Sequence, residues 1–292
     1  MLRRWRRAVA HLYGVASKKM DECPGRDGLS QLVPRRNCSK VAATPAPDSV
    51  PRGSLPKTNV KLNALFWSKP FSLALAPDSP LKIEEPQYEG IKRLMLKLLL
   101  FYSKQSKAIR GANVVYRRVI TQVDKPAIYD VFHLEKTFKT TFSLLVLHMW
   151  LVLRRLKEEG KEGVDFGQYL YETYNHDLEL RVSKAGVNLL LTKWMKDLEK
   201  IFYGNIVAYD AAMSPEARND DLLNVIWRNI FADDGSPMPN GAAADAVKAL
   251  SRYTRRESTC LSLTDKEAIF SGNFMFTSLE NQISRSELSL KR

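Results

Sequence analysis

The sequence predicts an all-α protein with a single multi-helix domain of about eight helices. Apolar residues recur at spacings of three and four along most of residues 86–279, and no segment has the alternating pattern of a convincing hairpin. The longest uncharged run, FSLLVLHMWLVL at residues 142–153, has twelve residues, whereas a bilayer span needs about twenty. This run therefore predicts a buried core helix, and we expect no membrane span.

The first half of the domain contains three expected helical segments. Pro86 suits a first helical turn, and one face after it carries Ile91, Leu94, Met95, Leu98 and Tyr102. A second segment follows Gly111, with Val115, Val119 and Val123 four residues apart, although their β-branched side chains leave a strand as an alternative. The third and strongest helix is expected at residues 135–158, where Gly160 can take the left-handed cap conformation.

The second half of the domain completes the helical pattern. Asp165 is expected to cap a helix that runs toward Arg181, and an apolar stripe from Val187 to Tyr209 predicts a longer helix. Three more helices are expected at Asp220–Phe231, Ala242–Arg256 and Thr264–Phe270. Residues 264–267, Thr-Asp-Lys-Glu, read as a capping box that opens the last of them.

Prolines divide the chain into its expected parts. Nine prolines lie between Cys23 and Pro86 with little periodicity, so this region is predicted to be extended or disordered. The predicted organisation has four parts: a targeting leader and disordered segment at 1–60, a proline-rich linker at 61–85, the helical domain at 86–279, and a disordered tail at 280–292.

The first twenty residues form a basic, amphipathic leader with six Lys or Arg and no acid. Trp5, Val9, Leu12 and Ala16 share one helical face, with Arg3, Arg7, His11 and Lys18 opposite. This composition is typical of an organelle import signal, and a basic surface helix or nucleic-acid arm is the alternative.

The formal charge of +13 belongs mostly to the leader region. Residues 1–60 hold 12 Lys or Arg against 4 acids, and the remaining residues hold 33 against 28. A near-balanced body does not require a polyanionic partner. Cys23 and Cys38 fall in the leader region and Cys260 stands alone, so we expect a free buried or half-buried thiol and no thiolate cluster for zinc.

Common catalytic motifs are absent from the sequence, which predicts a protein that is not an enzyme and has no cofactor. There is no phosphate-binding glycine loop, no GxGxxG after a strand, no HExxH and no GxSxG. His148 lies on an apolar helical face and is predicted to be a neutral core residue, with a ligand or proton-switch role as the alternative. His176, with Glu172 four residues before it, does not match the Glu-x-x-His spacing of a di-iron site, so no metal is expected.

Helix-borne tryptophans are normally packing residues, and Trp150, Trp194 and Trp227 are expected to follow that rule. If they were exposed at a groove, the same side chains would anchor an apolar partner segment. The charged cluster from Arg154 to Glu162 is expected to be a solvated helix end.

Several helical segments together resemble the ubiquinol-cytochrome c chaperone family over roughly residues 90–278. The segments are LHMWLVLRRLKEEGKEG at 147–163, WMKDLEKIFYGNIVAYD at 194–210, LLNVIWRNIF at 222–231, LSRYTRRE at 250–257 and IFSGNFMF at 269–276. The resemblance implies an all-helical domain in the mitochondrial matrix, loosely held at the inner membrane. It also implies a small partner assembly subunit, contact with the mitochondrial ribosome, and newly made cytochrome b as the client that is held for haem insertion and assembly.

The leading hypothesis is therefore an assembly chaperone for the mitochondrial cytochrome bc complex. Its client or partner groove is expected around His148, Trp150, Arg154, Trp227 and Arg228. The alternative is an RNA- or ribosome-binding module that uses Arg252, Arg255 and Arg256, or Arg117 and Arg118. A third hypothesis is a helical enzyme centred on His148 or on the Glu172 and His176 pair.

Overall fold

The computed structural model describes residues 62–84, 86, 88–187, 189–232, 237–238 and 241–280 of the 292-residue chain. The chain divides into the units Met1–Pro56 and Lys57–Arg292, and all described residues belong to the second. The predicted leader at 1–60 and residues 281–292 of the predicted tail lie outside the described ranges.

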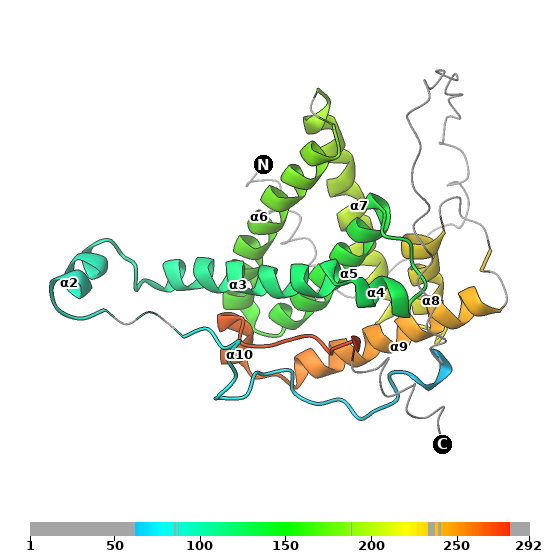
Figure 1. Ribbon diagram of the computed structural model, residues 1–292, viewed down its shortest axis with the longest axis horizontal. Helices are drawn as coiled ribbons and strands as arrows, with labels where there is room; N and C mark the ends of the chain where they lie inside the picture. Colours follow the sequence, from blue (N-terminus) through cyan, green and yellow to red (C-terminus); the bar gives the residue numbers. More distant parts are fainter. Residues whose placement is uncertain are drawn as a thin grey trace, which may run out of the picture. The chain divides into compact units, whose positions relative to one another are not determined.

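The described part is all-α, which confirms the predicted fold class (Figure 1). The elements are η2 (Leu62–Ala64), α2 (Gly90–Leu98), α3 (Lys104–Asp124), α4 (Pro126–Val131), α5 (Phe138–Lys157), α6 (Gly160–Lys184), α7 (Leu191–Ala212), α8 (Asp221–Ile226), the π-helical η3 (Trp227–Phe231), α9 (Ala242–Ser262) and α10 (Lys266–Ser271). None of the helices in these ranges is both long enough and apolar enough to span a bilayer.

Helix α5 forms the centre of the core. Every residue from Phe142 to Val152 is buried, as expected for a helix that is apolar around its whole circumference. It packs against α3, α6, α7 and α9. The helix begins at Phe138 because Thr137 accepts a hydrogen bond from the Thr140 backbone N–H and so caps its first turn. The prediction of a buried core helix here is confirmed.

Helix α3 resolves the alternative of helix or strand. Val115, Val119 and Val123 lie on one buried helical face, and Ser103 caps the helix by accepting from the Ser106 N–H. At Gly111 the helix passes so close to α10 that an added Cβ would lie 2.0 Å from the Phe270 carbonyl oxygen. Glycine therefore permits the closest approach between these two helices.

The connection between α5 and α6 is shorter than predicted. Gly160 has the expected left-handed conformation, with φ of +60°, but α6 begins at this same residue. The prediction that Asp165 caps the helix is wrong, because Asp165 lies inside α6. The acid in the first turn is Glu162, where a negative charge complements the helix dipole.

The start of α10 also differs from its predicted position. Asp265, rather than Thr264, is the N-cap, and its carboxylate accepts from the Ala268 N–H at 2.8 Å. Thr264 instead donates to the Cys260 carbonyl and accepts from the Leu73 N–H at 2.9 Å. The predicted capping box is therefore wrong by one residue, because Thr264 bonds to α9 and to the extended segment. Cys260 is a free, buried thiol, as predicted.

The segment expected to be a linker packs on the helices. Leu62, Leu65, Phe66 and Leu73 are buried, and η2 contacts α9. Beyond η2 the chain is extended and forms an antiparallel bridge between Ala74 and Phe274. Residues 62–84 therefore consist of η2, turns and extended stretches, and they belong to the folded unit.

Helix α2 forms where helical spacing predicts, although it starts at Gly90 rather than Pro86. None of its residues is buried, so its apolar face lies outside the core of the described part. Figure 1 shows α2 standing apart from the other helices, beyond the beginning of α3.

Candidate functional site: a groove between α3, α6 and α10

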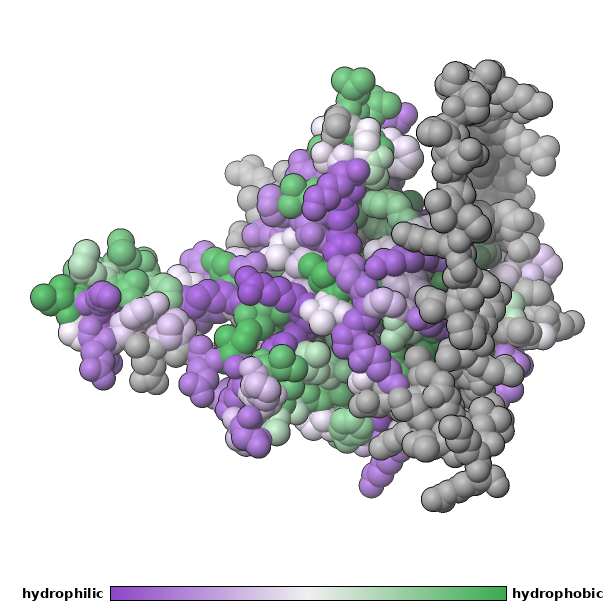
Figure 2. Space-filling view, in the orientation of Figure 1, coloured by the Kyte–Doolittle hydropathy of each residue, from purple (hydrophilic) through white to green (hydrophobic). Residues whose placement is uncertain are grey.

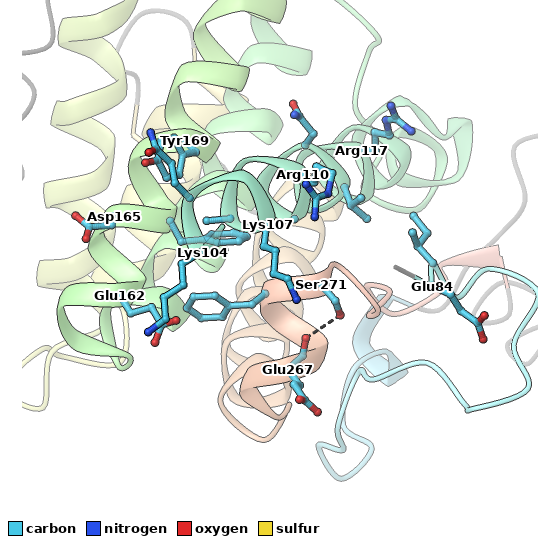
Figure 3. Close-up of a pocket in the computed structure, with 18 of the residues that line it drawn as sticks. Glu84, Lys104, Lys107, Arg110, Arg117, Glu162, Asp165, Tyr169, Glu267 and Ser271 are labelled. Carbon is cyan, nitrogen blue, oxygen red and sulfur yellow. Dashed lines mark hydrogen bonds between the residues drawn. The ribbon is translucent and has the colours of Figure 1, made fainter. Parts of the chain in front are cut away.

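An open groove of about 1120 Å³ lies between α3, the first turns of α6, and α10. Ile83, Glu84 and Pro86 of the extended segment add a further side (Figure 3). Four parts of the chain that are distant in sequence therefore build this surface.

The floor of the groove is apolar. Phe270 from α10 is half-buried, and its ring centroid lies 4.7 Å from that of the buried Phe166 of α6, which supports it from below. Ala108 and Val114 contribute the side of α3, and Tyr169 continues the α6 side. An apolar floor of this size can bury side chains of a polypeptide segment.

The rim of the groove carries both signs of charge in nearly equal number. The cations are Lys104, Lys107, Arg110, Arg117 and Lys161, and the acids are Glu84, Glu162, Asp165 and Glu267. Lys104 extends toward Glu162 in Figure 3, and Lys266 donates to Glu162 at 2.8 Å. This hydrogen bond lowers the pKa of Glu162 from its ordinary value. A mixed rim suits a polypeptide with charges of both signs better than a polyanion.

Hydrogen bonds behind the groove fix its extended side. The Ile83 N–H donates to Asn273 Oδ1 at 2.8 Å, and Asn273 Nδ2 donates to the Ile83 carbonyl at 3.0 Å. Arg118 donates to the carbonyls of Leu81 at 2.6 Å and Gly272 at 3.0 Å. The side formed by Ile83, Glu84 and Pro86 is therefore anchored to α3 and to the residues that follow α10.

The structure places two of the five predicted site residues inside the core. His148 is fully buried and donates from Nδ1 to the Leu144 carbonyl at 2.8 Å, while Nε2 accepts from the Tyr253 hydroxyl at 2.9 Å. Trp150 is buried, packs on Tyr209, and donates from Nε1 to Asp210 at 2.8 Å. His148 is thus the satisfied core histidine that the sequence predicts, and neither side chain presents surface to a partner.

The stability of the fold is expected to fall between pH 6.5 and pH 4 because of His148. Burial lowers the pKa of His148 to about 4, and the hydrogen bond to Leu144 opposes this shift. As the pH falls below about 6.5, His148 takes up a proton in the unfolded chain but stays neutral in the folded chain. The free energy of unfolding therefore decreases as the pH is lowered through this range. The expected loss by pH 4 is about 3 kcal/mol.

Urea unfolding of the wild type and of His148→Gln at several pH values measures this effect. The variant should lose the pH dependence that His148 contributes, whatever its absolute stability. Equal pH slopes for the two proteins would contradict the assignment of a neutral buried imidazole.

The other three predicted site residues lie at or near the surface. Arg154 is partly exposed and lies 3.6 Å from Asp210. Trp227 is half-buried and stacks on Phe231 with ring centroids 6.1 Å apart, and Arg228 is exposed. None of them lines the groove between α3, α6 and α10. Their role in binding a partner stays a prediction.

Most arginines of the RNA-binding alternative hold the fold together. Arg252 donates to the carbonyls of Leu62 and Leu65, and Arg256 donates to the Ser68 carbonyl. Arg118 donates to the Leu81 and Gly272 carbonyls beside the groove. Arg255 donates to the Asn219 carbonyl at 3.4 Å. Of the five arginines in that hypothesis, Arg117 is exposed and the other four are partly or fully buried. The clusters therefore do not form an open basic patch.

The described residues contain no group of three or more His, Cys, Asp or Glu side chains that could hold a metal ion. His176 is exposed, and Glu172 accepts instead from Gln168 at 3.1 Å.

Sequence reasoning missed the groove. Its residues come from four separate segments, and each charged side chain looks locally like part of an ordinary solvated helix face. Gly111 was the strongest available signal, because a glycine inside an amphipathic helix indicates close backbone approach.

Fold and site together define an all-α protein with an open groove that has an apolar floor and a mixed charged rim. The model of the ubiquinol-cytochrome c chaperone family matches residues 130–277, just over half of the chain. The chain belongs to this family.

Relatives agree with this membership, and a solved structure has the same fold. The chain is 25% identical over 183 residues to the human ubiquinol-cytochrome c reductase complex assembly factor 1, covering 61% of this chain and 59% of that protein. It is 29% identical over 107 residues to the yeast mitochondrial protein CBP3, covering 35% and 31%. The crystal structure of a Cbp3 homolog from Brucella abortus has the same fold, with a TM-score of 0.53, 24% identity, and coverage of 64% of this chain and 98% of that one. The chain thus spans about three fifths of the human relative and a third of the yeast one.

Proposed function

We propose that this protein is a mitochondrial assembly chaperone for the ubiquinol-cytochrome c reductase complex and acts without catalysing a reaction. The observation that carries the proposal is the match of the chaperone family to residues 130–277, which include the whole of α5 to α10. The human relative is an assembly factor of that complex, and the yeast relative is mitochondrial. The acid-free basic leader supports the same compartment.

The proposed client is newly made cytochrome b, held through a segment of its chain in the groove between α3, α6 and α10. The apolar floor at Phe270, Ala108 and Val114 can bury apolar side chains, and the mixed rim can pair with charges that flank them. A chaperone needs such reversible contacts and no nucleophile. The groove is preferred to the surface at Trp227 because it combines concave shape with an apolar floor.

The remaining partners in the proposal are a small assembly subunit, the mitochondrial ribosome and the matrix face of the inner membrane. They are supported by the family resemblance. The near-balanced charge of residues 61–292 favours protein contacts over extended contact with RNA.

Filling the groove is expected to reduce client binding. Ala108 is half-buried on the groove side of α3, so Ala108→Trp places a large ring over the floor. We expect recovery of newly synthesised cytochrome b with the tagged protein to fall roughly tenfold, the effect of losing one strong contact. The measurement is affinity capture from mitochondria after labelled translation.

The matched control is Ala185→Trp, an exposed site at the C-terminal end of α6, the end opposite to the groove. It should leave capture unchanged, and both variants should keep the wild-type melting temperature. Absence of cytochrome b from the wild-type capture would overturn the proposed function. Normal capture by a folded Ala108→Trp protein would overturn only the groove assignment.

A further inference from the structure

Helix α2 carries the largest run of exposed apolar side chains in the described part of the chain. Ile91 is 79% exposed and Leu98 is 76% exposed. Leu94, Met95, Leu99 and Leu100 are also exposed, and no residue of α2 is buried. Figure 2 shows this apolar surface as the green region over α2. A patch of this kind on a protruding helix indicates an interaction surface.

The apolar side chains of α2 occupy one face. Ile91, Leu94, Met95 and Leu98 follow helical spacings of three and four, whereas Lys92, Arg93 and Lys97 lie on the rest of the circumference. All three cations are exposed. The helix is therefore amphipathic, with one side apolar and the other basic.

The backbone at the end of α2 adds another apolar side chain to this surface. The Phe101 N–H donates to the Leu96 carbonyl at 2.9 Å and the Leu100 N–H donates to the Lys97 carbonyl at 3.2 Å, which is the pattern of a Schellman cap. Leu100 sits at the left-handed position of this cap, with φ of +57°, where glycine is the favoured residue. An exposed leucine in an unfavourable conformation is consistent with a function for its side chain.

Charge indicates which surface covers α2. Residues 90–102 contain Lys92, Arg93 and Lys97 and no acid, and one acid, Glu89, precedes the helix at its N-cap. Basic side chains beside an exposed apolar face are the combination that binds anionic bilayers. A partner protein with an apolar groove would accommodate the leucines alone, whereas an anionic bilayer also attracts the three cations of α2.

Arg110 connects this surface to the rest of the fold. Its guanidinium lies 4.0 Å from the centre of the Phe101 ring and donates to the Phe101 carbonyl at 2.8 Å. The chain that follows α2 is thereby fastened to α3, which lines the groove.

We propose that α2 docks in the surface of an anionic lipid bilayer, with its leucine face among the acyl chains and its cations at the headgroups. This inference rests on the proposed function, in which the protein attaches to the inner membrane. It adds that α2 is the segment that makes the attachment. Because α3 also lines the groove, a docked α2 would hold the groove close to the bilayer from which an apolar client segment would come.

The test uses the full-length protein with vesicles of phosphatidylcholine, alone or mixed with phosphatidylglycerol. We expect strong flotation with the mixed vesicles only, decreasing as salt is raised. Leu94→Glu/Leu98→Glu should weaken partitioning roughly 100-fold, because two leucine side chains that would be buried among the acyl chains are lost. Lys92→Gln/Arg93→Gln/Lys97→Gln should weaken it roughly fivefold per cation on the mixed vesicles.

The matched control is Ile201→Glu/Val207→Glu, which changes two exposed apolar residues on α7. This variant should float like the wild type, and all variants should keep the wild-type melting temperature because the residues changed are exposed. Hydrogen exchange of residues 90–102 should slow on mixed vesicles, which distinguishes α2 from the basic leader.

Three results would overturn the proposal. They are unchanged partitioning of the Leu94→Glu/Leu98→Glu protein, unchanged exchange at residues 90–102 while the protein floats, and loss of self-association without loss of flotation in the leucine variant. The last would show that a second copy of the chain covers α2. None of these measurements involves cytochrome b, so failure here leaves the proposed client function standing.

Discussion

Replacing Glu257 with leucine is expected to lower the free energy of unfolding by about 3–5 kcal/mol, because the change leaves the Arg256 guanidinium buried without its counterion. Glu257 has no exposed surface, and Arg256 is 5% exposed. Glu257 Oε1 accepts from Arg256 at 3.2 Å and from the Thr277 hydroxyl, and Oε2 accepts from the Thr277 N–H at 3.1 Å. Burial raises the pKa of Glu257, and these donors oppose the rise.

This buried pair joins three parts of the chain. Arg256 also donates to the Ser68 carbonyl at 3.3 Å and to the Thr277 hydroxyl at 2.7 Å. Loss of Glu257 therefore loosens the extended segment and the residues after α10, as well as α9 itself. Urea unfolding measures the effect.

The double variant Arg256→Met/Glu257→Leu provides the control. Removing both charges leaves no uncompensated ion, so the double variant should be more stable than Glu257→Leu alone. A loss of under about 1 kcal/mol in the single variant, as for an exposed pair, would contradict the account.

Replacing Arg155 with methionine is expected to lower the free energy of unfolding by about 2–4 kcal/mol, because two carbonyl groups near the end of α9 lose their donors. Arg155 is buried, although sequence reasoning predicts a solvated helix end there. Its Nε donates to the Leu261 carbonyl at 3.0 Å and Nη2 donates to the Thr264 carbonyl at 3.1 Å. Nη1 pairs with Glu159 at 2.7 Å. The methionine retains the apolar stem and removes the donors.

The neighbouring Arg154→Met variant is a matched control. Arg154 is one third exposed and pairs with Asp210 only at 3.6 Å, so its replacement should cost less than about 1 kcal/mol. In Arg155→Met, hydrogen exchange should also accelerate in α10, which carries Phe270 in the groove floor. Equal effects of the two substitutions on stability would contradict the bonding described for Arg155.

Sequence patterns predicted where helices form better than they predicted which helix faces are buried and which are exposed. The run from Phe142 to Val152 is apolar around the whole helix, and only burial can satisfy it. The leucine face of α2 has equally clear helical spacing, and the helix forms. Spacing identifies the apolar face of a helix, but it does not show whether that face meets the protein core or another apolar surface, so the exposure of α2 could not be predicted.

The roles of charged residues depended on contacts distant in sequence. Arg118, Arg252 and Arg256 looked like surface cations, but each donates to a backbone carbonyl more than 30 residues away. The groove was not predicted for the same reason. Its charged rim forms only when α3, α6 and α10 pack together and bring Lys104, Glu162 and Glu267 to one surface. Gly160 was predicted correctly because its left-handed conformation is a local requirement.

Site-specific photo-crosslinking tests the central claim most directly. A photo-reactive phenylalanine analogue is placed at Tyr169 in the groove or at Trp227 on the surface suggested by the sequence, and mitochondrial translation products are labelled. We predict crosslinks from position 169 to newly synthesised cytochrome b and none from position 227. Crosslinks to cytochrome b from position 227 alone, or from neither position, would contradict the account of the groove as the client site.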